Sequence, residues 1–453
     1  MRQLRTFAVL GLAWLMVAAT RSPAAALKAG VARADITPLP GERMWGYAGR
    51  KSPAQGTLDP LYARVLVLEV GEQTMALVEL DLGRVFGPAT VQKIRDDARQ
   101  SSGISYVLIT AIHTHSGPVV EDRYPSGVPD WETAAVAKIG QAIREAHGHA
   151  VEARLGTGYG VAYIGHNRLR DEPDGTVTWF QTNATMVPTV PVDPTVAVLR
   201  VDTADGKPLA VIVNYACHPV IFGPDNLKYS ADFAGVMVKT VEAAFGGKPL
   251  CMFLQGGDGD INPYYAVTPL EQDAVQRRNW TGETLAKEVI RVGKSIETRA
   301  DSSPSLDITE DWLPMKARWN LKKYKSYLVK SDGDWAAEEY VRKMTSPKLP
   351  VATVLIDKRI AIMTMPGEPF VEFQQEWRRR CPVPDAFFLG YANAHFDYFP
   401  TIRQASLGGY GAGSSATQIE PDAGAIMVDH AVVKAYEMLG KLSDTPEELL
   451  KPH

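Results

Sequence analysis

The sequence has few cysteines, no basic run and, beyond its N-terminus, no long apolar stretch. Its 453 residues include three Cys, at positions 217, 251 and 381, and no CxxC pair. A disulfide framework and a thiolate zinc finger are therefore excluded. Lys and Arg number 48 against 52 Asp and Glu, without clustering, so we expect no nucleic-acid partner. After residue 26, no apolar run approaches the ~20 residues of a transmembrane helix.

Three widespread catalytic signatures are also missing. The chain contains no GxSxG nucleophile elbow, no GxxxxGK[ST] phosphate loop and no HExxH helix. The sequence therefore gives no support to a serine hydrolase of the elbow type, to a nucleotide-phosphate site or to a zincin.

Residues 1–26 are typical of a secretory signal peptide. Arg2 and Arg5 precede an apolar run from Phe7 to Ala19, and three alanines end the segment before Leu27. The run is too short to span a bilayer comfortably. We expect cleavage near Ala26 and a secreted or periplasmic protein, whose formal charge changes from −4 to −7 on removal of three Arg.

The mature chain alternates short apolar runs with longer amphipathic stretches. This alternation predicts an α/β fold of mostly parallel, buried strands flanked by helices, forming one large domain over residues 27–453. The expected strands are Arg64–Val70, Thr74–Leu80, Tyr106–Ile112, Leu209–Tyr215, Leu250–Leu254, Arg359–Met365 and Ala386–Leu389. The expected helices are Pro88–Arg99, Trp131–Ala146, Ala231–Phe245, Glu283–Glu297, Pro369–Arg380 and Gly424–Leu439.

Polar residues gather directly after five of these strands. Because strand ends converge on one crevice in open α/β sheets, we expect the five loops to share a site. These loops contain His113, His115, His218 and Glu368, a set of metal-ligating side chains. Imidazole nitrogen with carboxylate oxygen suits zinc best. His113 and His115 could bind one metal together only if the chain bends between them. Otherwise one of them is a ligand and the other takes part in the reaction. The sequence does not decide which of the two is the ligand.

Asp258 and Asp260 lie in a Gly-rich loop after one of these strands. They are consistent with a second metal site, but turn formation is the commoner role of Asp in such a loop. Cys217, next to His218, is interpreted as a small buried residue rather than a nucleophile.

A series of motifs, in order along the chain, resembles the neutral/alkaline, non-lysosomal ceramidase family. The most specific is HTHSGP at residues 113–118. The others are Gly30–Thr37, Trp45-Gly46-Tyr47, Asn167-Arg168, His218-Pro219 with Asp232, Pro366-Gly367-Glu368, and the pair Tyr398 and Tyr410.

The resemblance implies a set of site residues and an activity. It implies a zinc ion held by His113, His218, Glu368 and Tyr398. It places His115, Arg168 and Tyr410 around the reacting carbonyl. The implied reaction is hydrolysis of the amide of N-acylsphingosine, in which zinc would activate water and polarise the carbonyl.

The sequence departs from the family pattern in two places. The family's G-D-x-S-P loop is Gly259-Asp260-Ile261-Asn262-Pro263 here, and Asn262 cannot be a nucleophile, although it can donate a hydrogen bond to an oxyanion. The chain also ends at His453, so we expect no β-sandwich domain of the kind that ceramidases carry after the catalytic domain.

The leading hypothesis is an exported zinc hydrolase that cleaves an amide or ester bond by metal-activated water. A small-molecule or lipid-like N-acyl substrate, presented in solution or at a membrane surface, follows by analogy only. The alternatives are a catalytically inactive zinc protein that binds an amphiphile or glycan, and a zinc lactonase or cyclic amidase. The sequence does not indicate an oligomeric state.

Overall fold

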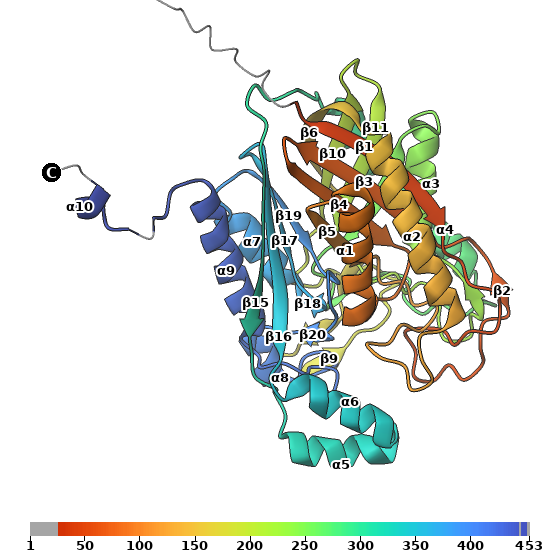
Figure 1. Cartoon of the computed structure of the whole chain (residues 1–453). Coiled ribbons are helices and arrows are strands. Elements are labelled where there is room, and N and C mark those ends of the chain that lie inside the picture. The colour runs from red at the N-terminus through yellow and green to blue at the C-terminus, as the bar shows by residue number, and fades with distance from the viewer. Residues whose placement is uncertain (1–25, 444, 451–453) are drawn as a thin grey trace, which may run out of the picture.

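The computed structural model describes residues 26–443 and 445–450. The predicted signal peptide, apart from Ala26, lies outside the described residues. Two sheets dominate the structure (Figure 1). The larger has the strand order β13-β11-β10-β6-β1-β3-β4-β5. Its strands are β1 (Lys28–Asp35), β3 (Tyr62–Val70), β4 (Gln73–Leu80), β5 (Tyr106–Ala111), β6 (Val151–Val161), β10 (Thr195–Thr203), β11 (Pro208–Tyr215) and β13 (Leu250–Gln255).

The second sheet has the order β15-β16-β17-β19. Its strands are β15 (Leu306–Pro314), β16 (Lys348–Ile356), β17 (Ile360–Thr364) and β19 (Asp385–Leu389). Short strand pairs lie outside the two sheets: β2 (Gly56–Thr57) with β12 (Lys228–Tyr229), β7 (Gly165–Asn167) with β14 (Ile261–Pro263), β8 (Leu169–Asp171) with β9 (Val177–Trp179), and β18 (Glu368–Pro369) with β20 (Tyr398–Phe399).

The described chain also has ten helices, several of which pack on the outer faces of the two sheets. They are α1 (Pro88–Ser102), α2 (Asp130–Gly148), α3 (Asp232–Ala244), α4 (Ala274–Ser295), α5 (Leu321–Ser331), α6 (Asp334–Met344), α7 (Val371–Arg380), α8 (Ile402–Leu407), α9 (Ala423–Met438) and α10 (Glu447–Leu450). Within residues 26–443 and 445–450, no helix is both long enough and apolar enough to cross a membrane.

The expectation of mostly parallel strands is wrong. In the larger sheet only β4–β5 and β11–β13 pair in parallel, and the neighbours between them are antiparallel. The second sheet has one parallel pair, β17–β19. The fold is therefore a mixed α/β one with a large, mostly antiparallel sheet.

The apolar character of the strands comes from layering rather than from parallel pairing. One core cluster lies between the two sheets and includes Leu66, Leu199 and Ile362. A second cluster lies between the larger sheet and α1 to α4, and a third between the second sheet and α7 and α9. The order is helices, sheet, sheet, helices, so both faces of each sheet are buried and antiparallel strands lose the alternation that usually identifies them.

The larger sheet curves so that its two edge strands, β5 and β13, come into contact. The Gln255 amide at the end of β13 donates to the Ile112 carbonyl just after β5, at 3.0 Å. Asn214 of β11 donates to the Phe388 carbonyl of β19 at 2.8 Å, which ties the second sheet to the same region. The loops after β5, β11, β13, β17 and β19 therefore meet, as the sequence predicts.

Candidate metal centre

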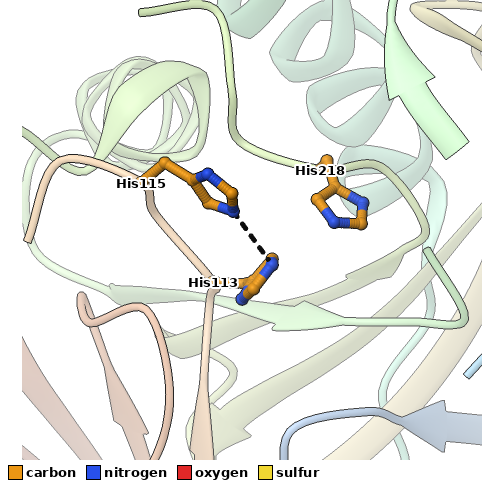
Figure 2. Close-up of side chains that lie close together, drawn as sticks. All are labelled: His113, His115 and His218. Atoms are coloured by element: carbon orange, nitrogen blue, oxygen red, sulfur yellow. Dashed lines mark hydrogen bonds between the residues drawn. The ribbon is translucent and has the colours of Figure 1, made fainter. Parts of the chain in front are cut away.

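Three histidines face one another in these loops (Figure 2). His113 adopts a left-handed backbone conformation, with φ of 71°, which is uncommon for a non-glycine residue. The chain therefore bends directly after β5, and the Nε2 atoms of His113 and His115 come within 3.2 Å of each other. This is the bend that the sequence requires if both rings are to face one ion.

Backbone carbonyls orient two of the imidazoles. Nδ1 of His113 lies 2.6 Å from the Gly83 carbonyl oxygen, and Nδ1 of His218 lies 2.6 Å from that of Asp258. Because a carbonyl can only accept, each Nδ1 carries the proton and each Nε2 keeps its lone pair. Metal-binding histidines commonly show this arrangement. His115 lacks it: within the described chain its Nδ1 is buried and has no hydrogen-bond partner.

Glu368 completes the group. Its Oε2 lies 3.5 Å from Nε2 of His113 and 3.4 Å from Nε2 of His218. Ligands bound tetrahedrally at about 2.0–2.1 Å are separated by about 3.3–3.4 Å, so these spacings fit a zinc-sized ion. Among the described residues, neither Glu368 Oε2 nor His218 Nε2 has a hydrogen-bond partner, although both are buried. Buried polar atoms are rarely left in this way, and a cation between them would satisfy both.

Two tyrosines and an arginine lie beside this group. Tyr398 on β20 pairs in register with Glu368 on β18, and its ring stacks on His218 with centroids 6.5 Å apart. The Arg168 guanidinium lies over the rings of Tyr398 and Tyr410, at 5.4 and 5.2 Å. Tyr410 in turn stacks on Trp179.

Asn262 contacts Arg168. Its Oδ1 accepts from Arg168 Nη1 at 3.2 Å, and its Nδ2 donates to the Gln181 carbonyl at 2.9 Å. The amide orientation is fixed, because a guanidinium only donates and a carbonyl only accepts. Arg168 also donates to the Gly259 carbonyl at 2.6 Å. Asn262 thus holds Arg168 in place.

The electrostatics leave His115 and His218 neutral and Glu368 ionised. Burial alone would lower the pKa of His113, but the charge of Glu368 outweighs it and raises that pKa. Burial, followed by the charge of Arg168, lowers the pKa of His218 to about 3. Burial and then His113 hold the pKa of His115 well below its usual value. Burial alone would raise the pKa of Glu368, but His113 outweighs it and holds that pKa well below the usual range. Neutral imidazole and ionised carboxylate are the forms that bind a metal.

A cavity of about 320 Å³ gives access to the group. His113, His115, Glu368, Tyr398 and Tyr410 lie in its wall. It is also lined by Trp45 and Tyr47, which the sequence identified only as part of a motif.

Sequence reasoning missed two residues next to this centre, His395 and Asp397. Together with Glu368 they form a second group whose ligand atoms lie within 4.8 Å of one another. The available signal was a His and an Asp two residues apart, in the loop after β19. Asp258 and Asp260, by contrast, serve the fold: Asp258 accepts from the Tyr391 hydroxyl at 2.6 Å, and Asp260 accepts from the Val371 amide at 2.9 Å.

The fold and the clustered histidines define a mixed α/β protein with a candidate metal centre. Residues 27–274 match the family described as neutral/alkaline non-lysosomal ceramidase, N-terminal. The match covers more than half of the chain, and the protein therefore belongs to this family. His113, His115, Arg168, His218 and Asn262 lie inside the matched stretch, whereas Glu368, Tyr398 and Tyr410 follow it.

Two solved structures share the fold. The crystal structure of neutral ceramidase from Pseudomonas aeruginosa is similar with a TM-score of 0.73 and 19% identity, over 93% of this chain and 76% of that one. A ceramidase complexed with C2 is similar with a TM-score of 0.72 and 18% identity, over the same shares of the two chains.

Proposed function

We propose that this protein is a zinc-dependent hydrolase that cleaves an amide bond, with an N-acyl lipid such as ceramide as the leading substrate class. The observation that carries the proposal is the pair of buried atoms, His218 Nε2 and Glu368 Oε2, that have no partner among the described residues. Together with His113 Nε2 they are spaced as zinc ligands are. Tyr398 is proposed as the fourth ligand, from its place beside Glu368 and His218.

The proposed chemistry assigns a role to each remaining residue. A zinc ion held there would lower the pKa of bound water toward ~7 and polarise the substrate carbonyl. His115 is neutral and borders the cavity, so it can take a proton and pass it to the departing amine. Arg168 and Tyr410 stabilise negative charge on the carbonyl oxygen. Asn262 holds Arg168 in position rather than replacing the family's serine as a nucleophile.

The test combines metal analysis with turnover. We expect about one tightly bound zinc per chain, and chelator-sensitive hydrolysis of at least one member of a panel of N-acylsphingosines, other N-acyl amines, esters and lactones. His218→Asn should lose metal and activity together. The matched control is His430→Asn, because His430 lies on α9, away from the site, and pairs with Asp311 at 2.9 Å. Absence of zinc from the wild-type protein would refute the ligand assignment. Zinc with no turnover would favour a binding protein, and turnover of lactones alone would favour a lactonase.

We also propose that the protein is exported. The basis is the sequence of residues 1–26, and β1 begins at Lys28, directly after the expected first mature residue, Leu27. N-terminal sequencing of the protein from its native host should return Leu27 or a close neighbour. An intact Met1 would contradict this proposal.

A further inference from the structure

The far side of Glu368 carries an unexplained buried histidine, His395. Its Nε2 lies 3.9 Å from Oε1 of Glu368, the carboxylate oxygen that does not face His113 and His218. The same Nε2 lies 3.0 Å from Oδ1 of Asp397. The geometry is nevertheless poor for hydrogen bonding, and within the described residues neither ring nitrogen of His395 has a hydrogen-bond partner.

Burial makes this arrangement costly without a ligand. His395 is only 3% exposed, and each unsatisfied buried polar group costs about 1–3 kcal/mol. Aromatic rings border the imidazole, with Trp45 edge-on at 5.8 Å and Tyr391 stacked at 6.2 Å, and they offer it no strong acceptor.

The cations around His395 do not take the place of a ligand. Lys343 donates to the His395 backbone carbonyl at 2.5 Å and pairs with Asp122, and Arg84 also pairs with Asp122. Neither is hydrogen-bonded to the imidazole. The carboxylates of Glu368 and Asp397 therefore lie next to the uncharged imidazole of His395, without a basic side chain between them.

We propose that Glu368, His395 and Asp397 form a second divalent-cation site, and that Glu368 bridges two metal ions. Oε2 would serve the centre with His113 and His218, and Oε1 the second. Two carboxylates with one imidazole suit Zn²⁺ or Mn²⁺. In a six-coordinate ion with bonds of about 2.1 Å, neighbouring ligand atoms are about 3.0 Å apart and opposite ones about 4.2 Å apart. His395 Nε2 lies 3.0 Å from Asp397 Oδ1 and 3.9 Å from Glu368 Oε1, which is within this range.

The proposed second site is more exposed to solvent than the first. Asp397 has a side chain 28% exposed and lies, with Glu368, in the wall of the 320 Å³ cavity. Solvent can therefore complete the coordination, and the second ion should bind more weakly than the first. The inference rests on the proposed metal centre because the two share Glu368, but it is independent of the substrate.

The experiment counts metal ions on the full chain. Metal-stripped protein is titrated with Zn²⁺ and, separately, with Mn²⁺, with stoichiometry read by calorimetry and elemental analysis. We expect two ions per chain in the wild type, one in His395→Gln and one in Asp397→Asn. His430→Gln should retain two. In the Mn²⁺-loaded wild type, the electron paramagnetic resonance spectrum should show two coupled ions, and the coupling should vanish in His395→Gln.

The outcomes separate the two proposals. One ion in the wild type that is retained in His395→Gln and lost in His218→Asn would overturn the second site and leave the first intact. One ion that is lost in His395→Gln and retained in His218→Asn would overturn the first. Two uncoupled Mn²⁺ ions would show that Glu368 does not bridge two metal ions. Circular dichroism and thermal unfolding identify any variant that fails to fold, and Asp397→Asn then decides in place of His395→Gln.

Discussion

At the scale of single residues, Asn262 determines what Arg168 can do. Its amide spans two partners, the Arg168 guanidinium and the Gln181 carbonyl, and it is buried. A side chain that contacts neither partner should leave Arg168 with its hydrogen bond to the Gly259 carbonyl but less firmly oriented toward the proposed position of the substrate carbonyl.

We predict that Asn262→Ala lowers kcat by up to about 10²–10³, the effect of losing one oxyanion donor, with metal content unchanged. KM should change less than kcat, because Arg168 is proposed to act on charge that develops during the reaction. The matched control is Asn183→Ala, since Asn183 is equally buried and bonds Val187 through both ends of its amide, away from Arg168. Equal losses in the two variants would point to a general packing defect.

Asn262→Ser asks whether serine alone separates this protein from the family pattern. A hydroxyl is too short to reach both partners as the amide does, so we expect activity between that of the wild type and that of Asn262→Ala. A large gain of ceramide hydrolysis would contradict this expectation and show that the loop is otherwise intact for the family reaction.

The sequence predicts the parts of the site that depend on side chains, but not those that depend on backbone groups or on burial. The sequence identified His113, His218 and Glu368 because each follows an apolar run, and the structure brings them together. The carbonyls of Gly83 and Asp258 that orient the imidazoles carry no side-chain signal, so only the folded chain reveals them. His395 was missed because nothing in its neighbourhood indicated that its ring nitrogens would be buried without partners.

At the scale of elements, β6 shows why the strand prediction was incomplete. This strand was not expected, because Gly156, Gly158 and Gly160 replace the branched residues that identify strands. In the structure the three glycines face the C-terminal half of α4 and the residues after it. A Cβ at Gly156 would lie 2.5 Å from the Ile296 side chain and 2.7 Å from the Glu297 carbonyl oxygen. The glycines therefore allow close packing, which no periodicity reveals.

We predict that Gly156→Ala lowers the free energy of unfolding by about 1–3 kcal/mol, the usual cost of overpacking. The backbone carbonyl cannot move aside as a side-chain tip could. Urea unfolding measures the change. Gly148→Ala at the end of α2 is the control, because a Cβ there meets nothing within 4 Å. If both variants are as stable as the wild type, α4 is not held close to β6 in solution.

The start of α3 carries a pH-sensitive carboxyl group. Asp232 has φ of 53° and is 1% exposed, and it accepts from the amides of Phe222 and Phe233. Burial raises its pKa from 3.8 to about 6, against these hydrogen bonds. Because the folded state holds this proton more tightly than the unfolded state, the ionised group costs stability. That cost is absent below about pH 4 and fully present above about pH 6.

We predict that Asp232→Asn, which tolerates the positive φ, gains stability relative to the wild type as pH rises from 4 to 6, by at most about 3 kcal/mol. Removing the charge changes how the free energy of unfolding varies with pH. Losing a hydrogen bond changes that free energy by the same amount at every pH. Denaturant unfolding at several pH values gives the difference. Asp205→Asn is the control, because the exposed Asp205 has its pKa lowered to about 2 by Lys207 and Thr203 and so titrates below this window. A pH-independent difference for Asp232→Asn would contradict the prediction.

At the scale of the whole molecule, the proposed metal centre joins the two sheets. His113 and His218 follow strands of the larger sheet, and Glu368 follows β17 of the second. A cation bound to all three would cross-link the layers at the edge where β5 and β13 meet. Without it, buried ligand atoms remain unsatisfied in the part of the chain that the structure describes, so metal should contribute to stability as well as to chemistry.

We predict that zinc at 1,000 times its dissociation constant stabilises the folded chain by about 4 kcal/mol and raises Tm by several degrees. Chelation should reverse the shift. Glu368→Gln should unfold at one temperature with or without zinc, because the residue that joins the sheets can no longer supply a charged ligand. His430→Gln, outside the centre, should keep the full response. A Glu368→Gln variant that still gains stability from zinc would show that the ion binds elsewhere, and the two sheets would then be held together by their shared apolar core alone.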